Sequence, residues 1–77
     1  MKYSVKIIGW RKGAEKISLI KKLTEEADIP ASQAKDIKDK VVDHNQQVEV
    51  IITSDKSAEI IISDFFEIGF LVEVNSL

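Results

Sequence analysis

The chain has 77 residues, of which 44% are hydrophobic, 31% are charged and 6% are aromatic, and its formal net charge at pH 7 is −2. This length predicts a single domain over residues 1–77. The absence of cysteine excludes disulfides, thiolate metal sites and thiol nucleophiles. No apolar stretch approaches the roughly 20 residues of a membrane span, and no signal peptide opens the chain, so we expect a cytoplasmic protein with no membrane partner.

Charge is distributed unevenly along the chain. Residues 11–40 carry eight basic and six acidic side chains, whereas residues 41–77 carry one lysine and seven acidic side chains. The near-neutral total argues against direct nucleic-acid binding, which needs a dominant basic surface. One part of the surface can still present lysines to an acidic partner, although a mixed, solvated surface explains the same pattern.

The first half of the chain predicts a strand and two helices. Residues 2–8 alternate, which indicates a strand with Tyr3, Val5 and Ile7 on its buried face. Apolar residues then recur at helical spacing and predict a helix over residues 14–27. Pro30 ends that region and suits the start of a second, short helix over residues 31–40. The inner arc of the first helix holds Ile17, Leu19, Ile20, Leu23, Thr24 and Ala27, and that of the second holds Ala34 and Ile37, followed by Val41 and Val42.

The second half predicts two strands around a third helix. A strand is expected over residues 48–53, a helix over residues 56–68 and a strand over residues 70–74. Ser54 or Asp55 can cap the helix at its start, because a short oxygen side chain accepts hydrogen bonds from its free amides. Gly69 is placed for a left-handed cap at its end. The buried faces of the strands hold Val48, Val50 and Ile52, and then Phe70, Val72 and Val74.

The element order β-α-α-β-α-β predicts an α+β two-layer sandwich, in which a three-stranded antiparallel sheet carries three helices on one face. Lys2, Lys6, Glu49 and Glu73 are expected on the other, solvated face. A ferredoxin-like fold is the nearest alternative, but it needs a fourth strand.

Residue types that carry chemistry are sparse. There is no phosphate-binding glycine motif, and His44, the single histidine, lies in a polar connection. The adjacent carboxylates of Glu25 and Glu26 lie on an expected helix surface and are interpreted as solvated side chains. We therefore expect no cofactor, no metal and no enzymatic activity. Trp10 is interpreted as a lid on the edge of the core, with an anchor for a partner as the alternative.

Several short motifs resemble one family in order and spacing. They are Lys16-Ile17-Ser18-Leu19-Ile20-Lys21, Ala34-Lys35-Asp36-Ile37, Ser54-Asp55 with Ala58-Glu59, Glu67-Ile68-Gly69 and Val72-Glu73-Val74. They resemble the patterns K-V-x-V-I-K, E-A-K-D-L, S-K-x-x-A-E and E-A-G-A-x-V-E-V of the C-terminal domain of the bacterial large-subunit ribosomal stalk protein. The resemblance spans roughly residues 3–74.

This resemblance implies a non-catalytic domain whose first two helices recruit translational GTPases, including elongation factors Tu and G. The matching positions, carried over from the family, are Lys16, Ile17, Ile20, Lys21 and Lys35. A small apolar patch ringed by lysines suits an acidic, partly apolar partner helix. The alternative is that Ile17 and Ile20 are core residues and the lysines are merely solvated.

The chain also departs from the family. Thr24 replaces an arginine, Ala31 replaces an exposed leucine and Gln33 replaces an acid, which leaves binding of the same factors open. The junction Asp28-Ile29-Pro30-Ala31 replaces a glycine-rich one. The chain starts at the domain, so we expect a freestanding homologue without the dimerising, ribosome-anchoring segment and hinge.

The expected third helix carries more apolar residues than one sheet face needs. Ile61, Phe65 and Ile68 form its inner stripe. Ile62 and Phe66 lie at the margin of this stripe, and Ile60 points nearly opposite. A second interface through Ile60, Ile62 and Phe66, for weak homodimerisation or a partner, is one hypothesis, and a wider buried stripe is the other. An adaptor like that of the Clp protease, which shares this fold, is a further alternative that rests on fold analogy alone.

Overall fold

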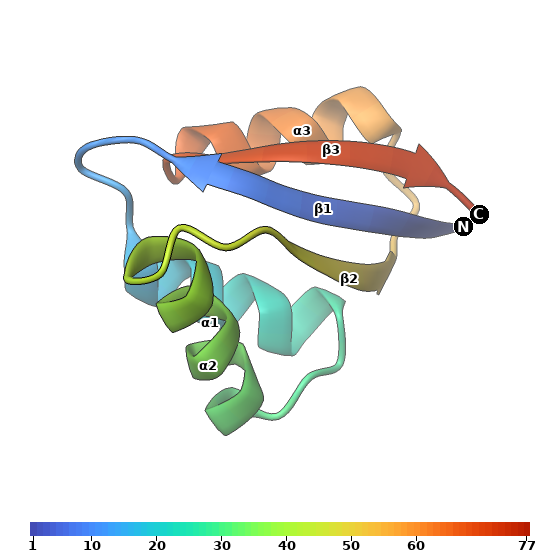
Figure 1. The fold of residues 1–77 in the computed structure, drawn as a ribbon. Coiled ribbons are helices and arrows are strands. Elements are labelled where there is room, and N and C mark those ends of the chain that lie inside the picture. The colour runs from blue at the N-terminus through green and yellow to red at the C-terminus, as the bar shows by residue number, and fades with distance from the viewer.

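A computed structural model describes the whole chain, Met1–Leu77, and confirms the predicted fold. The elements are β1 (Lys2–Trp10), α1 (Lys16–Glu26), α2 (Ala31–Val42), β2 (Val48–Thr53), α3 (Ala58–Glu67) and β3 (Phe70–Ser76). The strands form one antiparallel sheet in the order β2-β1-β3. In Figure 1 the central strand β1 lies between β3, along which α3 runs, and β2, on whose side α1 and α2 lie.

The core lies between the sheet and the layer of helices. It contains 14 buried hydrophobic residues, drawn from all six elements. Alternation places Tyr3, Val5 and Ile7 of β1 at its centre, as the sequence predicted. Phe65 of α3 and Phe70 of β3 are the largest side chains that are fully buried, and each contributes about 1.5–3 kcal/mol through the apolar surface it removes from water.

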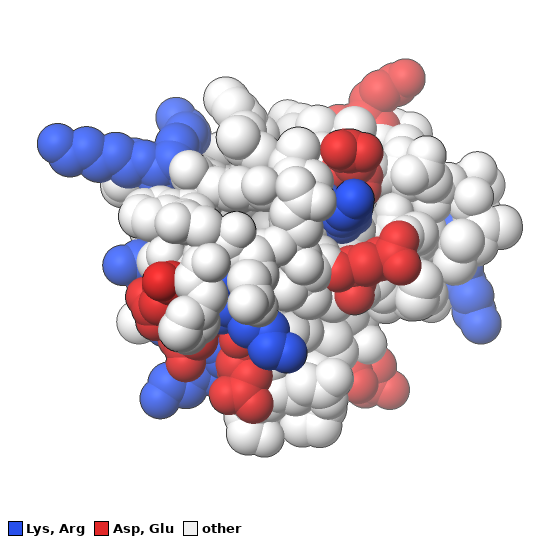
Figure 2. All heavy atoms as spheres, in the orientation of Figure 1, with Lys and Arg blue, Asp and Glu red and all other residues white.

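The opposite face of the sheet carries charge in its middle. The register places Lys6 of β1 opposite Glu49 of β2 on one side and Glu73 of β3 on the other. In Figure 2 a basic group lies between acidic groups over the strands of Figure 1, which agrees with this register. Ser4 also donates a hydrogen bond from its hydroxyl to the Glu49 carboxylate. The charged row explains why all three helices lie on the other face.

The observed start of α3 corrects the predicted cap. Ser57, and not Ser54 or Asp55, precedes the first helical residue, and its hydroxyl accepts a hydrogen bond from the Ile60 amide at 3.4 Å. Ser54 instead accepts from the Lys56 amide at 3.0 Å within the connecting turn. The helix begins two residues later than predicted, so the earlier oxygens are too far from its free amides.

The inner arc predicted for the first helix was too wide. Leu19 and Leu23 are fully buried, whereas the side chain of Ile17 is 74% exposed. At 100° per residue Ile17 lies 160° around the helix from Leu19, so one helix face cannot bury both. Ile20 lies between these directions and is partly buried against the core. The interpretation of Ile17 as a core residue is therefore wrong.

None of the three helices has both the length and the hydropathy of a membrane span.

The turn from α3 into β3 packs closely on the loop that precedes α1. Gly69 adopts a φ of +94°, as predicted for a left-handed cap. A Cβ atom at Gly69 would lie 2.6 Å from the Cα of Ala14. Two backbone hydrogen bonds close the joint, from the Arg11 amide to the Gly69 carbonyl (2.9 Å) and from the Glu15 amide to the Ile68 carbonyl (2.8 Å). Glycine is thus required here both by backbone conformation and by space.

We predict that Gly69→Ala lowers the free energy of unfolding by roughly 2–4 kcal/mol, because it adds a steric overlap to the cost of a positive φ. The matched control is Gly13→Ala, since Gly13 also has a positive φ, +88°, but has open space around it. The control should lose only about 1–2 kcal/mol. Urea unfolding monitored by circular dichroism measures both, and equal losses would contradict the steric account.

Candidate functional site

The exposed face of α1 brings together three of the residues carried over from the family. Ile17, Ile20 and Lys21 have the spacing i, i+3 and i+4, which places them on one side of a helix. Ile17 is among the most exposed large hydrophobic side chains of the chain, whereas Ile20 reaches the core with part of its surface. The patch formed by Ile17, Ile20 and Lys21 is therefore apolar at its centre, and Ile20 connects it to the core.

Lysines border this patch without partners of opposite charge. Lys16 and Lys21 are exposed, and neither belongs to any of the four ion pairs of the structure. The ammonium group of Lys16 lies 5.8 Å from the ring centre of Trp10, a distance compatible with a cation–π contact. Trp10 itself is partly buried against the core, which agrees with its interpretation as a lid. The two lysine charges remain available to an acidic partner.

Lys35 lies on the neighbouring helix. It is exposed on α2 next to the buried Ala34, and α2 packs against α1. Lys35 also takes part in none of the ion pairs. The pKa of Asp39 is lowered mainly by the hydrogen bond that Asp39 accepts from Lys38, and the positive charge of Lys35 adds to this effect. The structure thus places all five carried-over residues on the pair α1 and α2, where they define what we call the basic surface: Lys16, Ile17, Ile20, Lys21 and Lys35.

The three departures from the family also lie on α1 and α2. Thr24 is partly buried one turn after Ile20, and its hydroxyl donates to the Lys21 carbonyl at 2.8 Å. Ala31 and Gln33 are exposed in the first turn of α2. Asp28 precedes them with a φ of +52°, a conformation that asparagine and aspartate tolerate better than most residues. Ala31 and Gln33 are therefore surface positions, and Thr24 is partly exposed.

The predicted second interface on α3 divides into two surfaces. Ile60, Ile62 and Phe66 are exposed to 49%, 39% and 49% respectively. Ile62 and Phe66 are four residues apart and share one side of the helix, but Ile60 lies 120–160° away from them. The guanidinium of Arg11 lies 4.5 Å from the centre of the Phe66 ring and donates to the Phe66 carbonyl at 3.0 Å. Part of the exposed ring is therefore already covered from within the chain.

A group of charged side chains that no sequence pattern indicated connects α1 to α3. The ammonium of Lys22 lies 2.8 Å from the Glu26 carboxylate and 4.0 Å from that of Asp64, and 5.3 Å from the centre of the Phe65 ring. Asp64 also pairs with Lys56 at 2.9 Å, and this hydrogen bond raises the pKa of Lys56. The spacing of Lys22 and Glu26 could have indicated their pairing, but the contacts across to α3 carry no local signal.

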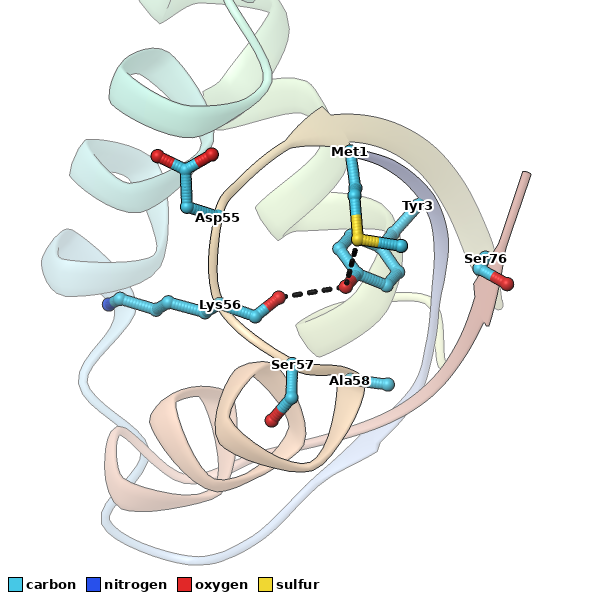
Figure 3. Close-up of a pocket in the computed structure, with 7 residues that line it drawn as sticks. All are labelled: Met1, Tyr3, Asp55, Lys56, Ser57, Ala58 and Ser76. Carbon is cyan, nitrogen blue, oxygen red and sulfur yellow. Dashed lines mark hydrogen bonds between the residues drawn. The ribbon is translucent and has the colours of Figure 1, made fainter.

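A shallow, open hollow of about 450 Å³ lies where both termini meet the start of α3 (Figure 3). Its lining is formed by Met1, Tyr3, Asp55, Lys56, Ser57, Ala58 and Ser76. At its floor the Tyr3 hydroxyl donates to the Lys56 carbonyl at 2.8 Å. Every buried side-chain polar atom of the chain has a hydrogen-bond partner, so no unpaired polar group points into the hollow. We therefore do not interpret the hollow as a binding site.

We predict that Tyr3→Phe costs about 0.5–1.5 kcal/mol of unfolding free energy, because it removes the bond to Lys56 and leaves that carbonyl unpaired. The loss should be read from urea unfolding and compared with that of Ser54→Ala, which removes only an exposed turn bond. If Tyr3→Phe leaves the free energy of unfolding unchanged, the hydroxyl does not stabilise the connection before α3.

His44, the other residue singled out by its chemistry, is exposed in the connection between α2 and β2. No group of three or more histidine, cysteine, aspartate or glutamate side chains is arranged to hold a metal ion.

Comparison with known proteins adds no assignment. The chain matches no protein-family model, and a search of curated proteins finds no match.

Proposed function

We propose that this protein is a non-catalytic protein-binding domain that uses the basic surface of α1 and α2. The observation that carries the proposal is Ile17, a large aliphatic side chain exposed to 74% on a regular helix. Covering such a side chain contributes about 1.5–3 kcal/mol to an interface. Lys16 and Lys21 beside it, and Lys35 on α2, belong to none of the ion pairs of the structure, and they favour a partner that combines acidic and apolar groups.

The partner class that we propose is a translational GTPase or another ribosome-associated protein. This part of the proposal rests on the resemblance of the motifs to the stalk domain, whose recruiting surface uses the same positions. The geometry is compatible with it, because the five residues lie on two helices that pack against each other. An acidic, partly apolar helix of such a factor would cover Ile17 and pair with the lysines.

We predict that the double variant Lys21→Glu, Lys35→Glu binds a purified translational GTPase of the same organism at least about tenfold more weakly than the wild type. The reason is that both substitutions convert attraction into repulsion at the contact. Isothermal titration calorimetry or fluorescence anisotropy measures the affinity.

The matched control is Lys2→Glu, Lys40→Glu, which changes the net charge equally but alters lysines outside the basic surface. It should keep at least half of the wild-type affinity, and circular dichroism should show that both variants remain folded. Equal losses in the two variants would mean that net charge, and not this surface, controls binding.

The departures from the family allow a gain-of-affinity test. We predict that Thr24→Arg, Ala31→Leu strengthens binding to the same GTPase by roughly two- to tenfold, because it adds a cation and apolar area at the edge of the basic surface. The same titration measures the gain. Unchanged affinity would indicate that a partner reaches neither position and would move the contact away from the junction of α1 and α2.

A further inference from the structure

The outward side of α3 has the chemistry that the basic surface should bind. Ile60, Ser63 and Glu67 follow the spacing i, i+3 and i+7 and therefore form one stripe, with Glu59 beside it. All four residues are exposed, and neither glutamate belongs to an ion pair. We call these four residues the acidic stripe. It combines a half-exposed isoleucine with two free carboxylates on a regular helix.

The two complementary surfaces cannot meet within one chain. On α1, Lys22 is the residue that reaches across to Asp64 of α3, and Ile17 lies 140° around the helix from Lys22. The basic surface thus faces away from the α3 of its own chain. A contact between the two surfaces therefore has to join two molecules.

We propose that the basic surface binds the acidic stripe of a second copy of this chain, in a head-to-tail arrangement. Charge complementarity selects this occupant: lysines outside any ion pair share α1 and α2 with the exposed Ile17, and glutamates outside any ion pair share α3 with the exposed Ile60. The proposal rests on the binding surface of the proposed function and names a partner for it. A translational GTPase and a second copy then compete for the same lysines.

Such a contact has a recognisable assembly behaviour. The two patches are different, so the interface is heterologous, and association continues into short open chains rather than stopping at a dimer. The outer side of one helix, α3, against the basic surface of α1 and α2 forms a small contact, which predicts weak association with a dissociation constant on the order of 1 mM. Salt at about 1 M should abolish it, because screening then acts within about 3 Å.

The test is sedimentation velocity of the full chain and of two variants. The first variant, Lys21→Glu, Lys35→Glu, reverses two charges of the basic surface. The second variant, Ile60→Ser, Glu67→Gln, removes the apolar side chain and one negative charge from the acidic stripe. The average mass of the wild type should rise steadily with concentration, and each variant alone should lose at least about tenfold in association constant. An equimolar mixture of the two variants should form dimers that do not grow, because each supplies the surface that the other lacks.

Several outcomes would overturn the inference. They are a wild type that stays monomeric at about 1 mM, a basic-surface variant that associates like the wild type, and a variant mixture that stays monomeric. A symmetric dimer through α3 would appear as the second of these. If the wild type is monomeric but binds the GTPase through its lysines, the inference fails and the proposed function stands. If the wild type self-associates but does not bind the GTPase, the inference stands and the proposed GTPase partner is wrong.

Discussion

The close joint between the start of α1 and the end of α3 fixes the arrangement of the helical layer. Gly69 lies against Ala14 at a distance that no side chain permits, and two backbone hydrogen bonds tie the loop to the turn. Arg11 reinforces the joint by covering the Phe66 ring and bonding to its carbonyl. These contacts and the Lys22–Asp64 ion pair hold α1 and α3 together. They therefore set the direction in which the basic surface faces.

The one-sided sheet determines where binding surfaces can lie. The charged row of Glu49, Lys6 and Glu73 leaves only the other face of the sheet available for packing, so all three helices share that face. A single layer of helices must expose the outer side of every helix. The outer sides of α1 and α3 carry exposed isoleucines among charged residues, and the proposed protein binding rests on these surfaces.

Local sequence patterns were sufficient to predict the fold but not to predict which side chains are exposed on the surface. Alternation in residues 2–8 and the apolar spacing of α2 and α3 predicted the buried residues, because burial follows the period of a strand or a helix. The exposure of Ile17 could not be read in this way, since it depends on how much of a wide apolar arc the sheet can cover. The contacts of Gly69 with Ala14 and of Arg11 with Phe66 join residues about 55 positions apart, so no local signal indicates them.

The central claim is that a protein partner binds the outer side of α1 and α2. The most direct measurement is a ¹H–¹⁵N NMR spectrum of the labelled domain during addition of a purified translational GTPase. The account predicts that line broadening and shift changes concentrate in residues 16–35, at Ile17 and Lys21 first, and spare the charged face of the sheet. A spectrum that does not change, or changes that concentrate on β2 and β3, would contradict it.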